Sequence, residues 1–393
     1  MFRLAVTLGL LSLIGPFAID MYLPALPGIA ADLGATEAQV QVTLISYFIA
    51  FGVAQLIYGP MADQSGRKLP IFLGVAIFLA GSLGATFSGS IGSLAAWRFL
   101  QGLGGAALMV VPRAVVRDRY TGAEATKLMA MIMLVISVSP MLAPLAGSVV
   151  IAFTGWRAIF GFMAVLAVLS LVLAALALPE TLAPERRVRV NLGNLGRGAR
   201  TLLTDPFFMG LTFIGGFGMA SFFVFIASAS FVYVEQFGLT PTQFSLAFAL
   251  NAVGFFGASQ VAGPLGARLG IRRLVRIGVQ GFSGFTALLF LAALLGHASL
   301  PLIAAGLFCA NACLGLVIPT TMVLALDEHG DIAGLASSLG GTMQMLAGGG
   351  MIGVSGLFFD GTALPMVAAI AVCGAIALGL TLAILPRRDI ASA

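Results

Sequence analysis

The chain has 393 residues, of which 60% are hydrophobic and only 9% are charged, whereas a typical soluble domain has about 25% charged residues. This composition excludes a soluble protein and predicts an integral membrane protein. The formal net charge of +5 does not indicate nucleic acid as a partner, because the Lys and Arg residues cluster between apolar runs, as topology signals at a lipid surface do.

Twelve apolar runs follow one another along the chain. Twelve helices of about 20 residues would use about 240 residues, which leaves short loops and one longer linker. The predicted fold is all-α and polytopic, with two pseudo-symmetric bundles of six transmembrane helices: residues 1–180, a cytoplasmic linker at 181–205, and residues 206–393. The runs lie at about 4–26, 38–58, 70–88, 92–114, 125–152, 157–178, 207–235, 241–262, 275–296, 300–326, 332–359 and 363–385.

The first run contains the segment GPFAIDMYLP (15–24), in which Asp20 lies between Pro16 and Pro24. A carboxylate in hydrocarbon is costly, so an acid at this depth normally faces a polar cavity or a partner and is a functional candidate. One hypothesis is that Asp20 takes up and releases a proton. The alternative is a structural Asp20 that caps a broken backbone near Pro24.

The loop after the second run reads GPMADQSGRK (59–68). We expect its Gly and Pro residues to permit a tight turn, Asp63 to face the positive end of a neighbouring helix, and Arg67 to pair with an acid. Such contacts would latch the cytoplasmic helix ends in one conformation and release them in another. The alternative is a solvated turn whose charges only set the topology. The candidate gate residues are Gly59, Asp63, Gly66, Arg67 and Lys68.

The fourth run carries a second intramembrane charge, Arg98, about one turn inside the span from the outer surface. Its depth is compatible with that of Asp20. The hypothesis is that Arg98, with Gln101 one turn further on, belongs to the polar network that sets the protonation of Asp20. The alternative is that Arg98 extends to the outer headgroups.

The fifth run is predicted to be kinked and closely packed, because Pro140 and Pro144 remove helical hydrogen bonds and Gly147 allows close approach. For the substrate, sparse polar and aromatic residues at mid-span predict a large, weakly selective apolar pocket. Residues of these types more often lie in a core or face lipid. The candidate cavity residues are Tyr22, Tyr47, Met109, Phe225, Asn251, Phe255, Met343 and Gln344.

The two halves echo each other. Gly263-Pro264 stands 204 residues after Gly59-Pro60, and Pro319 stands 207 residues after Pro112. Transporters are often built from such repeats, with the substrate site between them.

The basic residues predict that both termini are cytoplasmic, because only Arg98 and Arg157 fall toward the other side of the membrane. The residues on the predicted cytoplasmic side are Arg3, Arg67, Lys68, Arg113, Arg117, Arg119, Lys127, Arg186, Arg187, Arg189, Arg197, Arg200, Arg268, Arg272, Arg273, Arg276, Arg387 and Arg388.

Several of these motifs resemble those of the major facilitator superfamily (MFS). The loop GPMADQSGRK is similar to its signature loop between helices 2 and 3, and WRFLQGLGGA (97–106) to the helix 4 motif of its drug:proton antiporters. SPMLAPLAG (139–147) resembles the helix 5 motif of exporters, although it has Ala143-Pro144 in place of the usual Gly-Pro. IDMYLPALP (19–27) and PRAVVRD (112–118) look most like the bicyclomycin and chloramphenicol resistance branch, Bcr/CflA.

The resemblance implies a multi-pass protein of the bacterial inner membrane that exports small lipophilic molecules such as drugs in exchange for protons. It implies no cofactor beyond the proton motive force, contact with membrane lipids, and a monomer. A proton-coupled importer, or an exporter of a specific metabolite, stays open as the alternative. An enzyme is not expected, because no nucleophile, base or metal set clusters within a span and the two His residues fall at opposite membrane faces.

Overall fold

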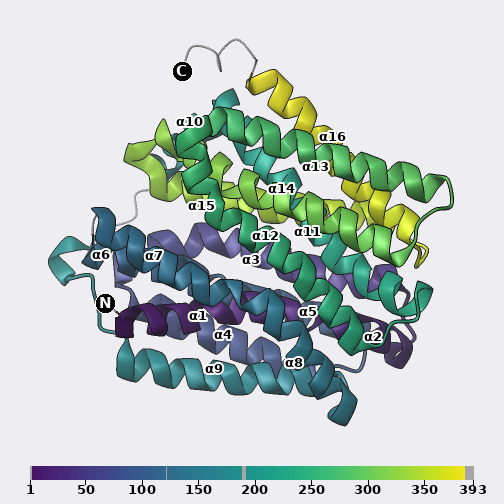
Figure 1. Ribbon diagram of the computed structural model, residues 1–393. Coiled ribbons are helices and arrows are strands. Elements are labelled where there is room, and N and C mark those ends of the chain that lie inside the picture. The colour runs from purple at the N-terminus through teal and green to yellow at the C-terminus, as the bar shows by residue number, and fades with distance from the viewer. Residues whose placement is uncertain (1, 121, 188–191, 386–393) are drawn as a thin grey trace. The chain divides into compact units, whose positions relative to one another are not determined.

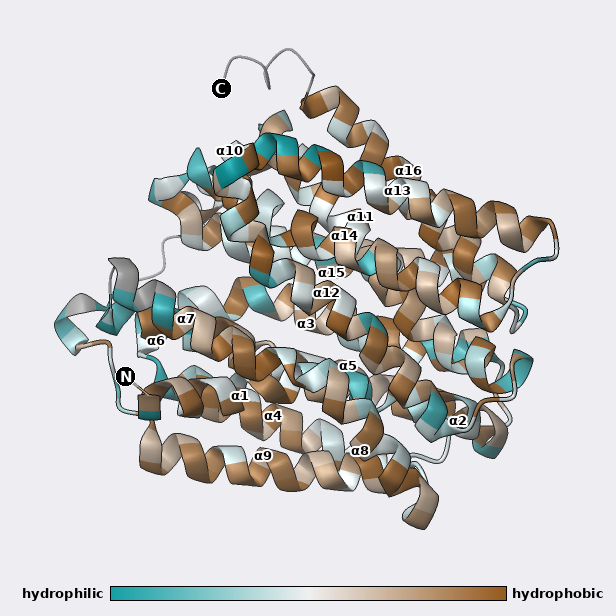
Figure 2. Ribbon diagram, in the orientation of Figure 1, coloured by the Kyte–Doolittle hydropathy of each residue, from teal (hydrophilic) through white to brown (hydrophobic). Residues whose placement is uncertain are grey.

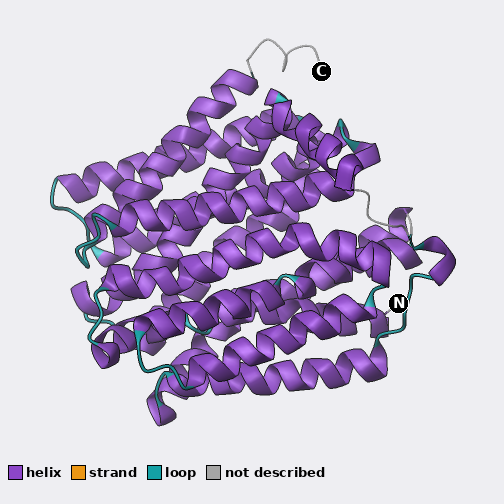
Figure 3. Cartoon of the chain, turned by 180° about the vertical axis from the view of Figure 1, so that it is seen from behind, coloured by secondary structure: helices purple, strands orange, loops and turns teal. Residues whose placement is uncertain are grey.

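The computed structural model describes residues 2–120, 122–187 and 192–385, and within these ranges the regular structure is helical, with no strand (Figure 3). The chain divides into two compact units, Met1–Gly196 and Arg197–Ala393. The division falls inside the predicted linker, whose residues 188–191 lie outside the described ranges. Arg189, Arg387 and Arg388, which were assigned to the cytoplasmic side, also lie outside them.

The N-terminal unit begins with a helix that is interrupted after Asp20 and continues through a series of long and broken helices (Figure 1). Its elements are α1 Phe2–Asp20, η1 Leu23–Ala25, α2 Leu26–Leu33, α3 Glu37–Ser65, α4 Lys68–Thr86, α5 Ile91–Gly105, α6 Ala107–Arg119, α7 Gly122–Ser137, α8 Ser139–Thr154, α9 Arg157–Ala177 and η2 Pro184–Arg186.

The C-terminal unit begins within α10, which crosses the division between the two units. The elements here are α10 Leu192–Thr204, α11 Pro206–Phe231, the π-helix η3 Val232–Gln236, α12 Pro241–Leu269, α13 Ile271–Leu294, α14 Leu300–Asp327, η4 Gly330–Ile332, α15 Ala333–Gly356 and α16 Ala363–Ile384.

Eleven of the described helical segments are long and apolar enough to cross a bilayer, and brown, hydrophobic positions dominate them in Figure 2. The helix α15, which corresponds to the eleventh predicted run, is not among them. Its 24 residues would span about 36 Å, more than the roughly 30 Å of hydrocarbon, but Gly, Ser, Thr and Gln residues dilute its apolar character. The helix α15 is therefore long enough for a twelfth membrane crossing, but its composition is less apolar than that of the eleven candidate spans.

The two halves share a local design that the sequence only partly revealed. The helices α3 and α12 each have 29 residues, begin with a Thr-Gln capping box at Thr36 and Thr240, and end at a glycine with positive φ. The first residue of α12 lies 204 positions after the first residue of α3, and the last residues of the two helices are separated by the same number. A capping box satisfies two otherwise unpaired backbone N–H groups, so the same signal starts the equivalent helix of each unit.

A tight turn was expected from Gly59, Pro60 and Gly66, but Gly59 and Pro60 do not take part in it. Both residues lie inside α3, which continues to Ser65. Proline fixes φ near its helical value, so a helix can continue through it at the loss of one hydrogen bond. The turn occurs instead at Gly66, whose φ of +91° favours glycine.

Two predicted spans contain breaks. The fourth consists of α5 and α6, which meet at Ala106, and the fifth of α7 and α8, which meet at Val138. At the first break α5 packs very closely on α4, because a Cβ added to Gly104 would lie 2.3 Å from the Gly74 carbonyl oxygen. The glycine run 102–105 therefore serves helix packing.

Candidate functional site

Asp20 is the last residue of α1 and is only 4% exposed. The helix ends there, and the chain continues through the short η1, with Pro24 in its first turn, into α2. No backbone N–H in the described ranges donates to the Asp20 carboxylate. Instead the Ser139 hydroxyl of α8 donates to Asp20 Oδ2 at 3.1 Å, so this carboxylate is held by a neutral donor from another helix.

Arg98 is fully buried in α5 and lies close to the same part of α1. Its Nη1 donates to the Ala18 carbonyl oxygen at 3.2 Å and to Gln101 Oε1. Its guanidinium carbon lies 4.7 Å from the ring centroid of Tyr22 and 4.4 Å from that of Tyr47. These cation–π contacts hold the cation in an aromatic box.

These contacts leave some of the hydrogen-bond donors of the Arg98 guanidinium without an acceptor. Its Nε and Nη2 atoms are buried and have no hydrogen-bond partner among the described residues. Nor does any described ion pair join Arg98 to Asp20. The two intramembrane charges thus approach the same segment of α1, yet they do not bind each other directly.

Gln101 links this cluster to two further helices. Its Nε2 donates to Ser82 Oγ of α4 at 2.7 Å and contacts the Met163 sulfur of α9 at 3.4 Å. Arg98 is therefore oriented by a side chain that is itself anchored, which is how buried polar networks fix one geometry.

Tyr22 and Tyr47, two of the cavity candidates, are fully buried in this cluster. The Tyr22 and Thr43 hydroxyl oxygens are 2.8 Å apart, and the Tyr47 hydroxyl donates to the Gly15 carbonyl at 3.1 Å. In this conformation both rings cover Arg98. Met109, the third candidate in this unit, is half-buried on α6.

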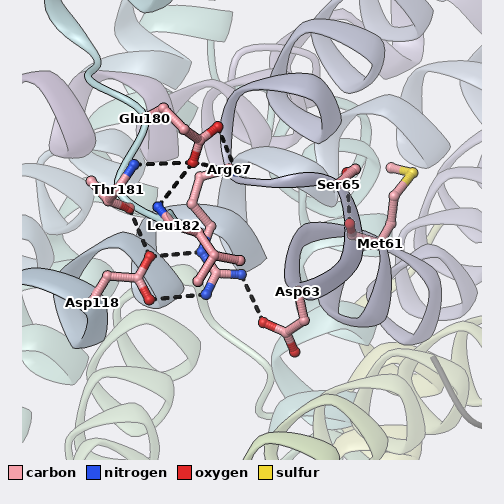
Figure 4. Close-up of polar contacts among 8 residues, drawn as sticks. All are labelled: Met61, Asp63, Ser65, Arg67, Asp118, Glu180, Thr181 and Leu182. Carbon is pink, nitrogen blue, oxygen red and sulfur yellow. Dashed lines mark hydrogen bonds and ion pairs between the residues drawn. The ribbon is translucent and has the colours of Figure 1, made fainter. Parts of the chain in front are cut away.

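Arg67, a gate residue between α3 and α4, lies between the side chains of Asp63 and Asp118 (Figure 4). Its Nε and Nη2 donate to the two oxygens of Asp118 at 2.8 and 2.9 Å, and its Nη1 donates to Asp63 Oδ1 at 2.7 Å. Burial opposes the charge, but the bonds to both acids outweigh it and raise the pKa of Arg67 above its ordinary value. This ion pair ties α3 to the end of α6.

Glu180, just after α9, completes the network and was not singled out from the sequence, where it falls at the start of the polar stretch. Its carboxylate accepts the backbone N–H groups of Arg67, Lys68, Thr181 and Leu182 at 2.9–3.1 Å. Burial would raise the pKa of Glu180, but these N–H donors outweigh it and hold the pKa below its ordinary value. A carboxylate here also suits the N-terminus of α4.

The helix 5 motif lies against the segment that follows Asp20. A Cβ added to Gly147 would lie 2.2 Å from the Met21 carbonyl oxygen, so only glycine permits this approach. Pro140 lies in the first turn of α8 and Pro144 inside it. The motif thus combines a weakened helix with tight packing on the backbone beside Asp20.

The remaining cavity candidates lie in the C-terminal unit, where Phe225 and Phe255 belong to one aromatic cluster because both rings contact Phe222. Phe225 stacks on Phe248 with ring centroids 5.6 Å apart, and Asn311 Nδ2 donates to Asn251 Oδ1 at 3.3 Å. Phe255 stacks on Phe222 at 6.0 Å, and Met343 is half-buried on α15. Gln344 lines a separate cavity of about 10 Å³ together with Thr212 and Thr321, which is room for about one water molecule.

Three further contacts were missed because they join residues far apart in the chain. Arg157 Nη1 donates to Asp32 Oδ2 at 2.6 Å, and the Trp156 indole N–H donates to the same oxygen at 3.0 Å. In the C-terminal unit His329 Nε2 and Asp205 Oδ2 are 2.7 Å apart. Burial favours a higher pKa for Asp205, but the hydrogen bond with His329 and two backbone N–H groups lower it.

Long apolar helices in two units with matching internal design are typical of one class of protein, the multi-pass membrane transporters. A family model described as Major Facilitator Superfamily matches residues 8–354. The chain belongs to this superfamily.

Several relatives match over most of the chain. An uncharacterized MFS-type transporter, YdgK, of Bacillus subtilis is 35% identical, with 96% of this chain and 95% of the relative covered. A bicyclomycin resistance protein homolog of Haemophilus influenzae is 32% identical over 95% and 93%, and a chloramphenicol resistance protein of Pseudomonas aeruginosa is 32% identical over 71% and 66%. These relatives confirm the resemblance to the drug:proton antiporter branch.

Solved structures share the architecture at low sequence identity. The crystal structure of a D-xylose-proton symporter has a TM-score of 0.77 at 16% identity over 99% of both chains. That of the human organic anion transporter MFSD10 has a TM-score of 0.69 at 18% identity, over 97% of this chain and 99% of that one. At such identities the likeness concerns the fold, and it confirms the helical MFS architecture.

Proposed function

We propose that this transporter exports small lipophilic molecules, drugs among them, in exchange for protons. The relatives named for resistance to bicyclomycin and chloramphenicol support this direction and this substrate class. The observation that carries the proton coupling is Asp20, a buried carboxylate bound by a neutral hydroxyl and by no cation in the described ranges. A carboxylate so placed can exchange a proton without first breaking an ion pair.

In this proposal the protein is a monomer with twelve transmembrane helices and both termini in the cytoplasm of a bacterial inner membrane. The helix α15 is the twelfth span. The bias of basic residues supports the orientation, and those near the linker at 181–205 lie along the anionic lipid surface. The bundles 1–180 and 206–393 then alternate between inward-open and outward-open states.

Transport requires no cofactor, because the proton motive force drives it. Each proton moving inward contributes about 2.3 kcal/mol per 100 mV of membrane potential and about 1.4 kcal/mol per pH unit. A substrate that enters the cavity favours the ionised Asp20 and displaces its proton, while Arg98 and Gln101 hold the surrounding α1 backbone in place. The sparse polar groups among the cavity candidates suit lipophilic cargo better than sugars.

The test is drug-driven proton movement in everted membrane vesicles that contain the wild type, Asp20→Asn or Asp360→Asn. Asp360 is a matched control because it is also an aspartate, but it lies in the loop before α16, where it binds Thr362. We expect Asp20→Asn to abolish proton-coupled efflux of chloramphenicol and of a panel of lipophilic drugs, and Asp360→Asn to retain it.

Undiminished coupling in Asp20→Asn would remove Asp20 from this role. If expression of the wild type leaves drug accumulation unchanged while a nutrient enters the cells faster, export itself is wrong and the chain is an importer.

A further inference from the structure

The hydroxyl of Ser139 has an unusual partner for a buried serine in a helix. Three other buried serines of the N-terminal unit, Ser82, Ser148 and Ser170, each donate to a carbonyl of their own helix at 2.8 Å. This local bond is the common choice for a helical serine. Ser139 is fully buried too, yet it donates to Asp20, 119 positions away in the chain.

The place of Ser139 in its helix explains this freedom. Regular helix ends at Ser137 and begins again at Ser139, and the N–H of Val138 bonds to the carbonyl three residues before it, Val135, at 3.3 Å. Pro140 follows and has no N–H to offer, so the turn before it lacks one helical hydrogen bond. Ser139 therefore stands at the point where the fifth transmembrane helix can most easily bend.

The same helix is pressed against the chain just beyond Asp20. Ser139, Ala143 and Gly147 are spaced four residues apart and share one face of α8. Ala143 is fully buried, and Gly147 allows the Met21 carbonyl oxygen to within 2.2 Å of where a Cβ would stand. Because α8 packs this closely on the backbone at Met21, a movement of the Ser139–Asp20 contact must also move α8.

We propose that Ser139 is a positioning residue that couples the protonation of Asp20 to the bend in the fifth transmembrane helix. This inference rests on the proposed proton exchange at Asp20. The ionised carboxylate accepts a charge-assisted hydrogen bond from Ser139, and such bonds are roughly twice as strong as neutral ones. When Asp20 takes up a proton this advantage is lost, and the hydroxyl turns to a backbone carbonyl at the end of α7, three or four residues earlier, as that of Ser148 binds the carbonyl three residues before it.

Other ionisable groups near Asp20 do not replace this contact. Arg98 of α5 binds the Ala18 carbonyl, and Tyr22 and Tyr47 bind Thr43 and Gly15. α8 carries no charged residue. The remaining charged groups on the helices that pack against α1 lie near the ends of their spans, at Glu124 and Lys127 of α7, Arg113, Arg117, Asp118 and Arg119 of α6, and Arg157 of α9.

The first test measures the protonation of Asp20 without any substrate. An infrared pH titration of the purified transporter in lipid nanodiscs follows the C=O band of protonated carboxyl groups, and the contribution of Asp20 is the part lost in Asp20→Asn. Removing a hydrogen bond to the ionised form should move the midpoint of this band upward by about one to two pH units in Ser139→Ala. Ser139→Cys, nearly the same size but a weak donor, should move it in the same direction.

Ser148→Ala is the matched control, because it removes a buried hydroxyl from the same helix without touching Asp20. It should titrate as the wild type does. If the band lost in Asp20→Asn has the same midpoint in the wild type, Ser139→Ala and Ser139→Cys, Ser139 has no such role, although the proposed function survives. If Asp20→Asn loses no titrating band, Asp20 exchanges no proton, and the proposed function falls together with this inference.

The second test follows the helix itself. Spin labels replace two exposed residues of the N-terminal unit, Leu134 of α7 and Leu176 of α9, in a background in which Cys309, Cys313 and Cys373 are replaced. The distance between the labels should change across the titration midpoint in the wild type and Ser148→Ala. In Ser139→Ala the change should be lost or moved to the higher midpoint, and an unaltered change at the wild-type pH would overturn the coupling.

Discussion

Two aspartates share Arg67, and replacing each by asparagine should have very different effects. Asp118 is 11% exposed and binds Arg67 through two hydrogen bonds, whereas Asp63 is 57% exposed and binds it through one. A hydrogen bond to a charged, buried group contributes about 1.5–3 kcal/mol, while an exposed ion pair contributes about 0.5 kcal/mol. Asp118→Asn leaves Arg67 buried, 6% exposed, with only the solvated acid as its charged partner.

We therefore expect Asp118→Asn to destabilise the protein by about 2–3 kcal/mol and Asp63→Asn by about 0.5 kcal/mol. For a unit of this size, 1 kcal/mol shifts the unfolding temperature by about 2–4 °C. The expected decreases are then about 4–12 °C for Asp118→Asn and about 2 °C or less for Asp63→Asn.

The assay is the loss of helical circular dichroism on heating both variants in the same detergent at one scan rate. The two substitutions are chemically identical and act on the same arginine, so their difference reports the greater burial of Asp118 together with its additional hydrogen bonds to Arg67 and Thr181. Equal decreases, or a larger one for Asp63→Asn, would refute the assignment of Asp118 as the main partner of Arg67.

Three further changes test other contacts. Gly147→Leu should prevent folding, because no side chain fits against Met21, whereas Gly161→Ala should not, since nothing lies within 4 Å of a Cβ there; the yield of monodisperse protein measures both. Because the pKa of Glu180 is lowered in the folded protein, the ionised Glu180 stabilises the fold at pH values above its ordinary pKa of 4.5. This contribution is lost as the pH falls through the lower folded pKa, so Glu180→Gln should lose less thermal stability than the wild type as the pH is lowered from about 5 to below about 4.5. Arg98→Lys should lower the unfolding temperature by about 4–8 °C, because lysine cannot keep both the Tyr rings and the two hydrogen bonds.

The features that the sequence predicted are those with local signals. Apolar runs gave the helices, and an acid isolated in such a run marked Asp20. The capping boxes that begin at Thr36 and Thr240 could also have been predicted, because a capping box depends on the residue types within four consecutive positions. The prediction that Gly59 and Pro60 form part of the turn was wrong, because both residues are compatible with a helix that continues through them.

The contacts that escaped prediction depend on the tertiary fold. Glu180 binds backbone N–H groups 112 and 113 positions earlier. Nearly every residue type has a backbone N–H group, so the sequence does not show which ones a distant carboxylate will bind. Ser139 stands in a motif that was noted for its prolines, yet only the packing of α8 on α1 brings its hydroxyl to Asp20. The sequence placed Arg98 inside the fourth apolar run, but it did not reveal that Arg98 binds a carbonyl and two rings instead of an acid.

The N-terminal unit contains two arrangements of arginine and aspartate, and their difference bears on how the transporter works. Arg67 and Asp118 form a bidentate pair, which strongly favours the ionised acid and makes the contact a fixed link between helices. Arg98 is held by the Ala18 carbonyl, Gln101 and the rings of Tyr22 and Tyr47, so its charge stays beside α1 without binding Asp20. In the proposed function, the absence of a direct ion pair to Asp20 in the described ranges allows this carboxylate to take up and release a proton. The first arrangement suits a latch between helices, and the second suits the proton exchange proposed for Asp20.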